Sequence, residues 1–248
     1  NWHKTVKVKF LGKKQEGIAS YSPALLDSVK RNSAATMNAF FGFDYWTAYE
    51  FSYLNSSNQP MLQMLEIKIP MSSKKTVESK SLKLYLASFY KRKFSHPKNA
   101  FNVIERDLST LLNAKVKVTK ITKFAQPPKS TLMSAESKRV AKNKVVRFEG
   151  FRSVCPVTGQ PDWATIYFHS DSSSLDLQKL NKVLKSYREQ GDFHETCIEN
   201  IFLSLYKDQK LLNLTVFGRF LRRGGIDINP LRSSSPEPIF YNFRDLAQ

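Results

Sequence analysis

One stretch of the chain combines reactive side chains with turn-forming residues: Ser153-Val154-Cys155-Pro156-Val157-Thr158-Gly159-Gln160-Pro161-Asp162-Trp163. Pro156 fixes its own φ and restricts the residue before it, while Gly159 permits a turn that a side chain would resist. The alternating residues 164–168 follow directly and predict a strand. We therefore expect a rigid loop at the mouth of a sheet, a usual place for a reactive group. Taken alone, the loop fits a small buried cysteine beside a turn-capping Asp162 at least as well.

The sequence on both sides of this loop repeats one order of elements. Alternating apolar residues predict strands at 46–54, 61–70, 115–124, 144–152, 163–168 and 212–221. Apolar residues at helical spacing predict helices at 79–91, 98–113, 175–189 and 193–206. The clearest break is Pro127-Pro128. We expect an α+β fold made of two copies of one unit, with a first module over residues 1–124, a basic linker over 125–143 and a second module over 144–248.

Composition narrows the classes of function. The chain has 248 residues and a net charge of +18, which favours anionic partners such as nucleotide phosphates or RNA. Between Lys115 and Arg147 the only acidic residue is Glu136, and aromatic residues are sparse, so a base-stacking platform is not indicated. No apolar run approaches the roughly 20 residues that cross a bilayer. The start of the sequence has no signal-peptide pattern, so a cytoplasmic location is expected.

Cysteine and histidine usage gives two further expectations. Two cysteines, Cys155 and Cys197, do not make a disulfide scaffold, and a reducing cytosol would keep them as thiols. Cys197 lies in an amphipathic pattern and is expected in the core. The four histidines are scattered without zinc-like spacing, so no metal site is expected.

Three further groups of residues are candidates for binding. Ser79 and Lys80 stand at a predicted helix start, where free N–H groups and ammonium charge suit an anion; alternatively, Ser79 is only an N-cap. His194 and Glu195 open another helix, where a carboxylate stays ionised and can accept two donors from a flat ligand. Alternatively, Glu195 only interacts with the helix dipole, and His194 is only an imidazole at the edge of the core. Arg222-Arg223-Gly224-Gly225 suits phosphate contact, or is an ordinary basic turn.

Read together, these motifs resemble one family. The segments that carry the resemblance are Glu78 to Tyr85, Cys155 to Trp163, Phe193-His194-Glu195 and Arg222 to Pro230. They closely resemble the NADPH-dependent 7-cyano-7-deazaguanine reductases, the nitrile reductases of queuosine biosynthesis, in the two-module branch. The resemblance runs from about Tyr21 to Ser233. It implies tandem tunnelling-fold (T-fold) modules, antiparallel sheets with helices packed on one face, and active sites where modules meet, with a homodimer as the suggested assembly.

The resemblance also implies a role for each candidate. Cys155 would attack the nitrile carbon to form a thioimide, and Asp162 would donate the proton. Two NADPH molecules would then reduce the group to the amine, giving 7-aminomethyl-7-deazaguanine. The implied substrate-binding residues are Val77, Glu78, Ser79, His194 and Glu195. The implied cofactor-binding residues are Ser79, Lys80, Arg223 and Gly224. No GxGxxG fingerprint is present, so the NADPH site would not be of the Rossmann type.

Two rival functions stay open on the sequence. The basic segment Lys115–Arg147 would suit a related T-fold amidinotransferase that acts on the nitrile base within tRNA. It would also suit a non-catalytic T-fold protein that grips tRNA. The Glu78-Ser79-Lys80 and Arg223-Gly224 motifs favour the reductase over the transferase, and the presence of both Cys155 and Asp162 argues against an idle fold.

Overall fold

The computed structural model describes residues 20–32, 37, 39–134, 136, 138–171, 174–208, 213–237 and 239–248. Residues 1–19 of the expected first module and Leu212, in one predicted strand, lie outside this description. The chain forms two compact units. The first comprises Asn1–Arg31, Trp46–Lys123 and Arg222–Asp227. The second comprises Asn32–Tyr45, Phe124–Leu221 and Ile228–Gln248.

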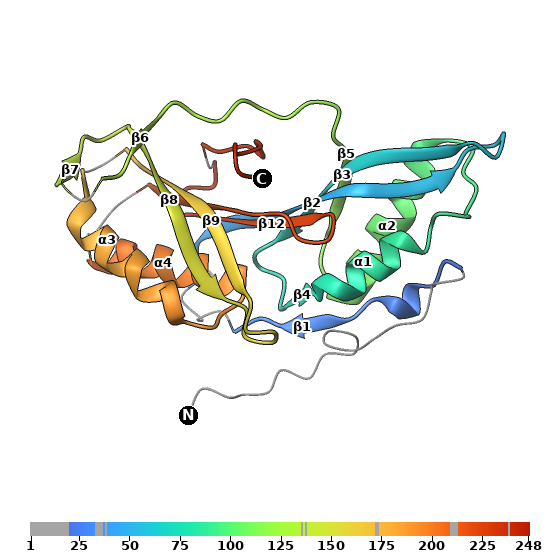
Figure 1. The fold of residues 1–248 in the computed structure, drawn as a ribbon, viewed down its shortest axis with the longest axis horizontal. Coiled ribbons are helices and arrows are strands. Elements are labelled where there is room, and N and C mark those ends of the chain that lie inside the picture. Colours follow the sequence, from blue (N-terminus) through green and yellow to red (C-terminus); the bar gives the residue numbers. More distant parts are fainter. Residues whose placement is uncertain are drawn as a thin grey trace. The chain divides into compact units, whose positions relative to one another are not determined.

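The first unit combines antiparallel strands with two helices (Figure 1). Its elements are η1 (Pro23–Leu25), β1 (Ser28–Lys30), most of β2 (Phe41–Leu54), β3 (Pro60–Pro70), β4 (Lys75–Val77), α1 (Ser79–Ala87), α2 (Pro97–Leu112) and β5 (Lys117–Lys120). The sheet order is β5-β3-β2, and β1 pairs with β4. The turn between β2 and β3 forms because the Asn55 side chain accepts from two N–H groups within it, as the polar run there predicts.

The core of the first unit is largely aromatic. Phe51 and Phe89 are fully buried, with ring centroids 5.3 Å apart, and Phe94 stacks on Phe89. The His96 imidazole caps the start of α2 by accepting from the Lys98 N–H, and the helix ends at Leu112, followed by Asn113 in the left-handed conformation. These contacts fix the segment between α1, which begins at the Glu78-Ser79-Lys80 motif, and α2.

The second unit is also mixed α+β (Figure 1). Its elements are β6 (Ser130–Leu132), β7 (Arg139–Val140), β8 (Val145–Val154), β9 (Pro161–Ser170), β10 (Leu175–Asp176), α3 (Leu177–Ser186), η3 (Tyr187–Glu189), α4 (His194–Asp208), β11 (Leu214–Phe220) and most of β12 (Ile226–Ser233). The sheet order is β12-β11-β9-β8-β6. Among these five strands, β11 with β12, β9 with β11 and β8 with β9 pair antiparallel, and β6 pairs with β8 in parallel.

Opposite faces of β11 bury different parts of the second unit. Gly218 faces α4, because a side chain there would meet Ile198. Phe217 points to the other face and packs with Phe240 and Phe243 from the last residues of the sequence. The strand therefore has α4 on one face and residues 239–248 on the other.

The predicted elements agree with the structure in type and differ at their ends. The helix predicted over 79–91 ends at Ala87, because the chain beyond it hydrogen-bonds to Leu54 on β2. The strand predicted over 115–124 is reduced to β5. Residues 125–143, predicted as a linker, contain β6 and β7. The sequence patterns did not identify β1, β4 or β12. Among the described residues, no helix is long and apolar enough to cross a membrane.

Candidate active site

Cys155 opens the turn that joins β8 to β9, where the sequence predicts a loop. Next to this turn, Ser153 pairs with Asp162 across the two strands. The Cys155 N–H donates to the Gln160 carbonyl (2.8 Å), and the Gly159 N–H donates to the Cys155 carbonyl (3.0 Å). Gly159 has φ +69°, a conformation that glycine adopts without strain. The thiol-bearing residue is partly exposed, so it sits on a hydrogen-bonded turn rather than in the core.

The segment before α4 is attached to the base of this turn. The Val154 N–H donates to the Gln190 carbonyl (2.9 Å), and the Asp192 N–H returns a bond to the Val154 carbonyl (3.0 Å). A side chain at Gly191 would lie 3.6 Å from the Pro156 Cα. The backbone that leads into α4 therefore lies against the backbone that carries Cys155.

The first turn of α4 brings His194 close to Asp162. The His194 Nε2 lies 3.4 Å from an Asp162 carboxylate oxygen, and their side chains are 17% and 8% exposed. Glu195, the next residue, is buried. A carboxylate in the first turn of a helix is stabilised by the helix dipole. The second unit thus gathers Asp162, His194 and Glu195 around the base of the Cys155 turn.

A further carboxyl group borders this cluster. Burial, with a smaller contribution from the charges of Glu199 and Glu195, raises the pKa of Asp192 to about 6. The sequence motifs did not single out Asp192 as a candidate site residue. Its position beside the Cys155 turn and its raised pKa mark it as part of the same acidic environment.

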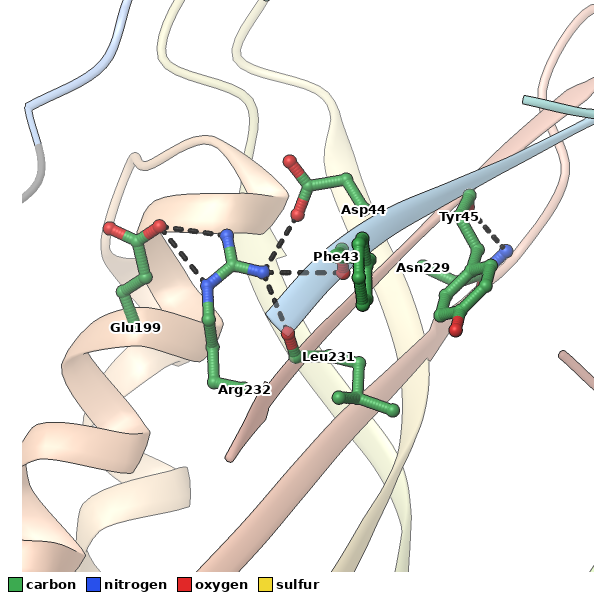
Figure 2. A network of polar contacts seen from close by, with 7 residues as sticks. All are labelled: Phe43, Asp44, Tyr45, Glu199, Asn229, Leu231 and Arg232. Atoms are coloured by element: carbon green, nitrogen blue, oxygen red, sulfur yellow. Dashed lines mark hydrogen bonds and ion pairs between the residues drawn. The ribbon is translucent and has the colours of Figure 1, made fainter. Parts of the chain in front are cut away.

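The second turn of α4 is anchored by a buried ion network (Figure 2). The Arg232 guanidinium donates to Glu199 through Nε (3.1 Å) and a terminal nitrogen (2.7 Å), and to Asp44 (2.8 Å). It also donates to the carbonyls of Leu231 and Phe43. Arg232 is completely buried, yet the two carboxylates hold its pKa above the ordinary value. Glu199 lies one helical turn after Glu195, so this network fixes the part of α4 that carries the candidate residues.

The sequence predicted the position of Cys197 correctly but gave no indication of the position of Phe220. Cys197 is completely buried, as predicted, and burial raises the pKa of its thiol. Phe220, at the end of β11, was missed, although its ring lies on the His194 ring with centroids 4.1 Å apart. No local pattern indicates this contact, because it depends on how β11 packs against α4.

In the first unit, Glu78 is the residue that caps α1. Its carboxylate accepts from the Lys80 N–H (2.8 Å) and the Ser81 N–H (2.7 Å). The expectation that Ser79 is the N-cap is therefore wrong, because Ser79 is already the first helical residue. The expectation of free N–H groups for an anion fails at these two amides, which Glu78 occupies. Val77 and Glu78 are buried, and β4 leads directly into this cap.

The Arg222–Gly225 turn lies close to α1 within the same unit. Gly224 has φ +54°, and a side chain there would approach the Lys83 Nζ to 3.3 Å. Gly225 has φ +76° and lies against the Glu50 carboxylate. The Arg222 guanidinium lies over the Tyr49 ring, 4.8 Å from its centroid. The structure thus brings the basic side of α1 next to a glycine turn flanked by arginines.

The arrangement of the titratable residues also decides whether they can hold a metal ion. Within the described ranges, no group of three or more His, Cys, Asp or Glu side chains is arranged to hold a metal ion.

Comparison with known proteins gives consistent matches along the chain. Residues 18–120 match the family described as "Nitrile reductase, 7-cyano-7-deazaguanine-reductase N-term", and residues 161–238 match the one described as "QueF-like protein". A protein of Burkholderia vietnamiensis named NADPH-dependent 7-cyano-7-deazaguanine reductase is 34% identical, over 96% of this chain and 97% of its own. A protein of the same name from Coxiella burnetii is 34% identical, over 96% of each chain.

Proposed function

This chain belongs to the 7-cyano-7-deazaguanine reductase family, and we propose that it reduces the nitrile of 7-cyano-7-deazaguanine to the aminomethyl group with NADPH. The observation that carries the proposal is the partly exposed Cys155 on its hairpin turn, beside the Asp162–His194 pair. The product, 7-aminomethyl-7-deazaguanine, is an intermediate for queuosine in tRNA. The chain is an oxidoreductase that uses NADPH.

Cys155 is the nucleophile in this proposal. Its thiolate adds to the nitrile carbon, so a C–S bond forms, one π bond of the nitrile breaks, and the nitrogen takes a proton from Asp162. The resulting thioimide holds the substrate covalently. After the first reduction the C–S bond breaks, the thiolate leaves, and an imine remains for the second reduction. Placement on a turn, outside the core, supports this role for Cys155 rather than Cys197.

The base is held by carboxylates in this scheme. Glu195 accepts from the N–H edge of the deazaguanine ring, because a buried carboxylate forms strong charge-assisted bonds to paired donors. His194 contacts the same ring. Val77, Glu78 and Ser79 complete the substrate-binding set. Glu78 already accepts from two backbone amides, so its remaining lone pairs are the ones that reach the ligand.

NADPH supplies one hydride for each of the two reductions. We assign its binding to Ser79, Lys80, Arg223 and Gly224. The residues fit this role, because Gly224 lets the backbone approach closely and Lys83 lies against it from α1. Lysine and arginine in this unit match the negative charge of the phosphates.

The architecture and setting are part of the same proposal. We propose tandem T-fold modules over residues 1–124 and 144–248, joined by 125–143, that work as a homodimer in the cytoplasm. The antiparallel strands and paired helices of each unit support the T-fold assignment. A reducing compartment suits an enzyme that needs Cys155 as a thiol.

Nitrile-dependent oxidation of NADPH tests the function directly. Purified protein should lose nicotinamide absorbance with 7-cyano-7-deazaguanine and not without it. No loss in folded protein would remove the reductase assignment. Steeply salt-dependent tRNA binding in its place would favour a tRNA-binding protein.

Intact-protein mass spectrometry tests the nucleophile. Incubation with the nitrile alone should add one substrate mass to the wild type and to Cys197→Ala, and none to Cys155→Ala. Cys197 is the matched control because it is the other cysteine of the sequence and is completely buried. An adduct that survives in Cys155→Ala contradicts the assignment.

A further inference from the structure

The contact between Phe220 and His194 has no role in the scheme above. The two rings are tilted by 34° with centroids 4.1 Å apart, and Phe220 is almost fully buried. The His194 Nε2, on the edge of the same imidazole, lies 3.4 Å from Asp162. One face of the imidazole is therefore covered by an apolar ring while its edge meets a carboxylate.

The backbone of Phe220 is fixed by two buried amide side chains. Its N–H donates to the Asn229 Oδ1 (3.2 Å), and its carbonyl accepts from the Gln248 Nε2 (2.8 Å). The Gln248 Nε2 also donates to the Asn229 Oδ1 (2.8 Å), and the Gln248 Oε1 accepts from the Arg219 Nε (3.0 Å). Because both side chains are buried and held by these further bonds, moving Phe220 would break the two hydrogen bonds of its own backbone.

Strand β9, which carries Asp162, is paired with the end of β11 that carries Phe220. Phe220 pairs with Ala164 on β9, and the Leu221 N–H donates to the Trp163 carbonyl (2.9 Å). Trp163 is the residue directly after Asp162. The ring under His194 and the carboxylate at its edge are thus held in one register of the sheet.

The space for this arrangement exists because residue 218 is a glycine. A Cβ at Gly218 would lie 2.7 Å from the Ile198 Cδ1 and 2.9 Å from a ring carbon of Phe220. Both distances are too short for a side chain. The absent side chain lets α4 and the Phe220 ring share the surface of β11.

We propose that Phe220 is a positioning residue that holds the His194 imidazole at Asp162, and that Gln248 in turn holds Phe220. The proposal rests on the proposed function, in which His194 contacts the substrate base. Without the ring, the imidazole has a free face and can rotate away from Asp162. Loss of an aromatic contact of this kind should raise KM for the nitrile base about three- to tenfold.

The decisive comparison is between two buried phenylalanines on opposite faces of β11. Phe220→Leu removes the ring under His194, whereas Phe217→Leu removes a ring that packs on Phe243. Both variants lose similar core packing and should show similar losses in Tm. Only Phe220→Leu should raise KM for the base, with KM for NADPH unchanged. Equal values of KM for the base in the two variants would overturn the proposal.

A second comparison tests the part played by Gln248. Gln248→Ala should also raise KM for the base, as Phe220→Leu does, because it removes the hydrogen bond to the Phe220 carbonyl. Leu246→Ala is the matched control in the same segment, since Leu246 is fully exposed. An unchanged KM in Gln248→Ala would remove Gln248 from the proposal.

Chemical modification of His194 provides a readout that needs no catalysis. Diethyl pyrocarbonate should modify His194 faster in Phe220→Leu than in the wild type or Phe217→Leu, measured by peptide mass spectrometry. The exposed His96 gives the internal reference rate. An unchanged His194 rate in Phe220→Leu refutes the positioning role even if the protein has no reductase activity. A wild type without activity but with the expected modification pattern refutes the proposed function alone.

Discussion

Replacing Arg232 by methionine should destabilise the protein far more than replacing a surface arginine. Arg232 is completely buried and donates to the carboxylates of Glu199 and Asp44, both of which are themselves buried. Methionine fills most of the same space without charge or donors. The change therefore removes the cation from two buried carboxylates. It also removes the hydrogen bond that the guanidinium donates to the Leu231 carbonyl. Breaking a buried ion pair from one side costs about 3–5 kcal/mol.

The pH dependence of this loss gives a sharper test than its size. For a buried carboxylate that has lost its cation, protonation costs less free energy than staying charged. The folded variant should hold protons that the unfolded chain releases, so its stability should fall as pH rises. The difference between wild type and Arg232→Met should therefore be larger at about pH 7.5 than at about pH 5.

Urea unfolding followed by circular dichroism measures both quantities. The matched control is Arg147→Met, which removes an arginine from a partly exposed pair with Glu149 on β8. An exposed pair contributes about 0–1 kcal/mol, so this variant should stay close to the wild type. A loss below about 1 kcal/mol in Arg232→Met, or a loss that grows toward acid pH, would refute the reasoning.

Three other substitutions test separate features by urea unfolding. Burial raises the pKa of Asp192 from 3.8 to about 6, so its stabilising contribution is complete below the lower value and is lost as pH rises through the higher one. Asp192→Asn should remove that loss and stabilise the protein at neutral pH by about 1–2 kcal/mol, after allowance for solvent screening. Glu189→Gln, at an exposed residue, is the control and should leave the stability unchanged. A destabilised Asp192→Asn variant would count against this reasoning. Gly218→Ala should cost about 1–3 kcal/mol because its Cβ meets Ile198, and a neutral result would show that the helix can shift. Glu78→Ala should cost about 1 kcal/mol through loss of the α1 cap, and an unchanged midpoint would contradict the cap.

The helices were predictable because their apolar residues follow the helical repeat. Helix α2 buries Phe101, Ile104 and Leu108, and α3 buries Leu177, Leu180 and Leu184. Each set lies on one side of its helix, so the sequence alone indicates both the element and its inner face. The boundaries were less predictable. Helix α1 starts at Ser79 because the backbone of Glu78 is still extended, with φ −77° and ψ 130°. The residue types of the motif do not determine this backbone conformation.

Strand β12 shows why other parts of the fold could not be predicted. It buries Asp227, Asn229 and Arg232, and a run with these polar residues does not alternate as a strand pattern requires. Their partners are distant in the sequence: Tyr49 for Asp227, Tyr45 for Asn229, and Asp44 for Arg232. A buried polar residue is tolerated only when such a partner is present. The strand becomes understandable only once these tertiary contacts are known.

The sequence indicated the candidate residues by their type, and the structure adds which of them lie together in each unit. In the second unit, Asp162 and Asp192 lie at the base of the Cys155 turn, and the buried Glu195 follows His194, which contacts Asp162. Carboxylates can accept hydrogen bonds from the N–H groups of a ring and can donate protons when protonated, so these residues suit the substrate side of the proposed reaction. In the first unit, Lys83 of α1 lies beside Gly224 of the Arg222–Gly225 turn, where positive charge and exposed backbone suit phosphates. The candidate residues of the two units therefore differ in charge, with carboxylates in the second unit and cations in the first.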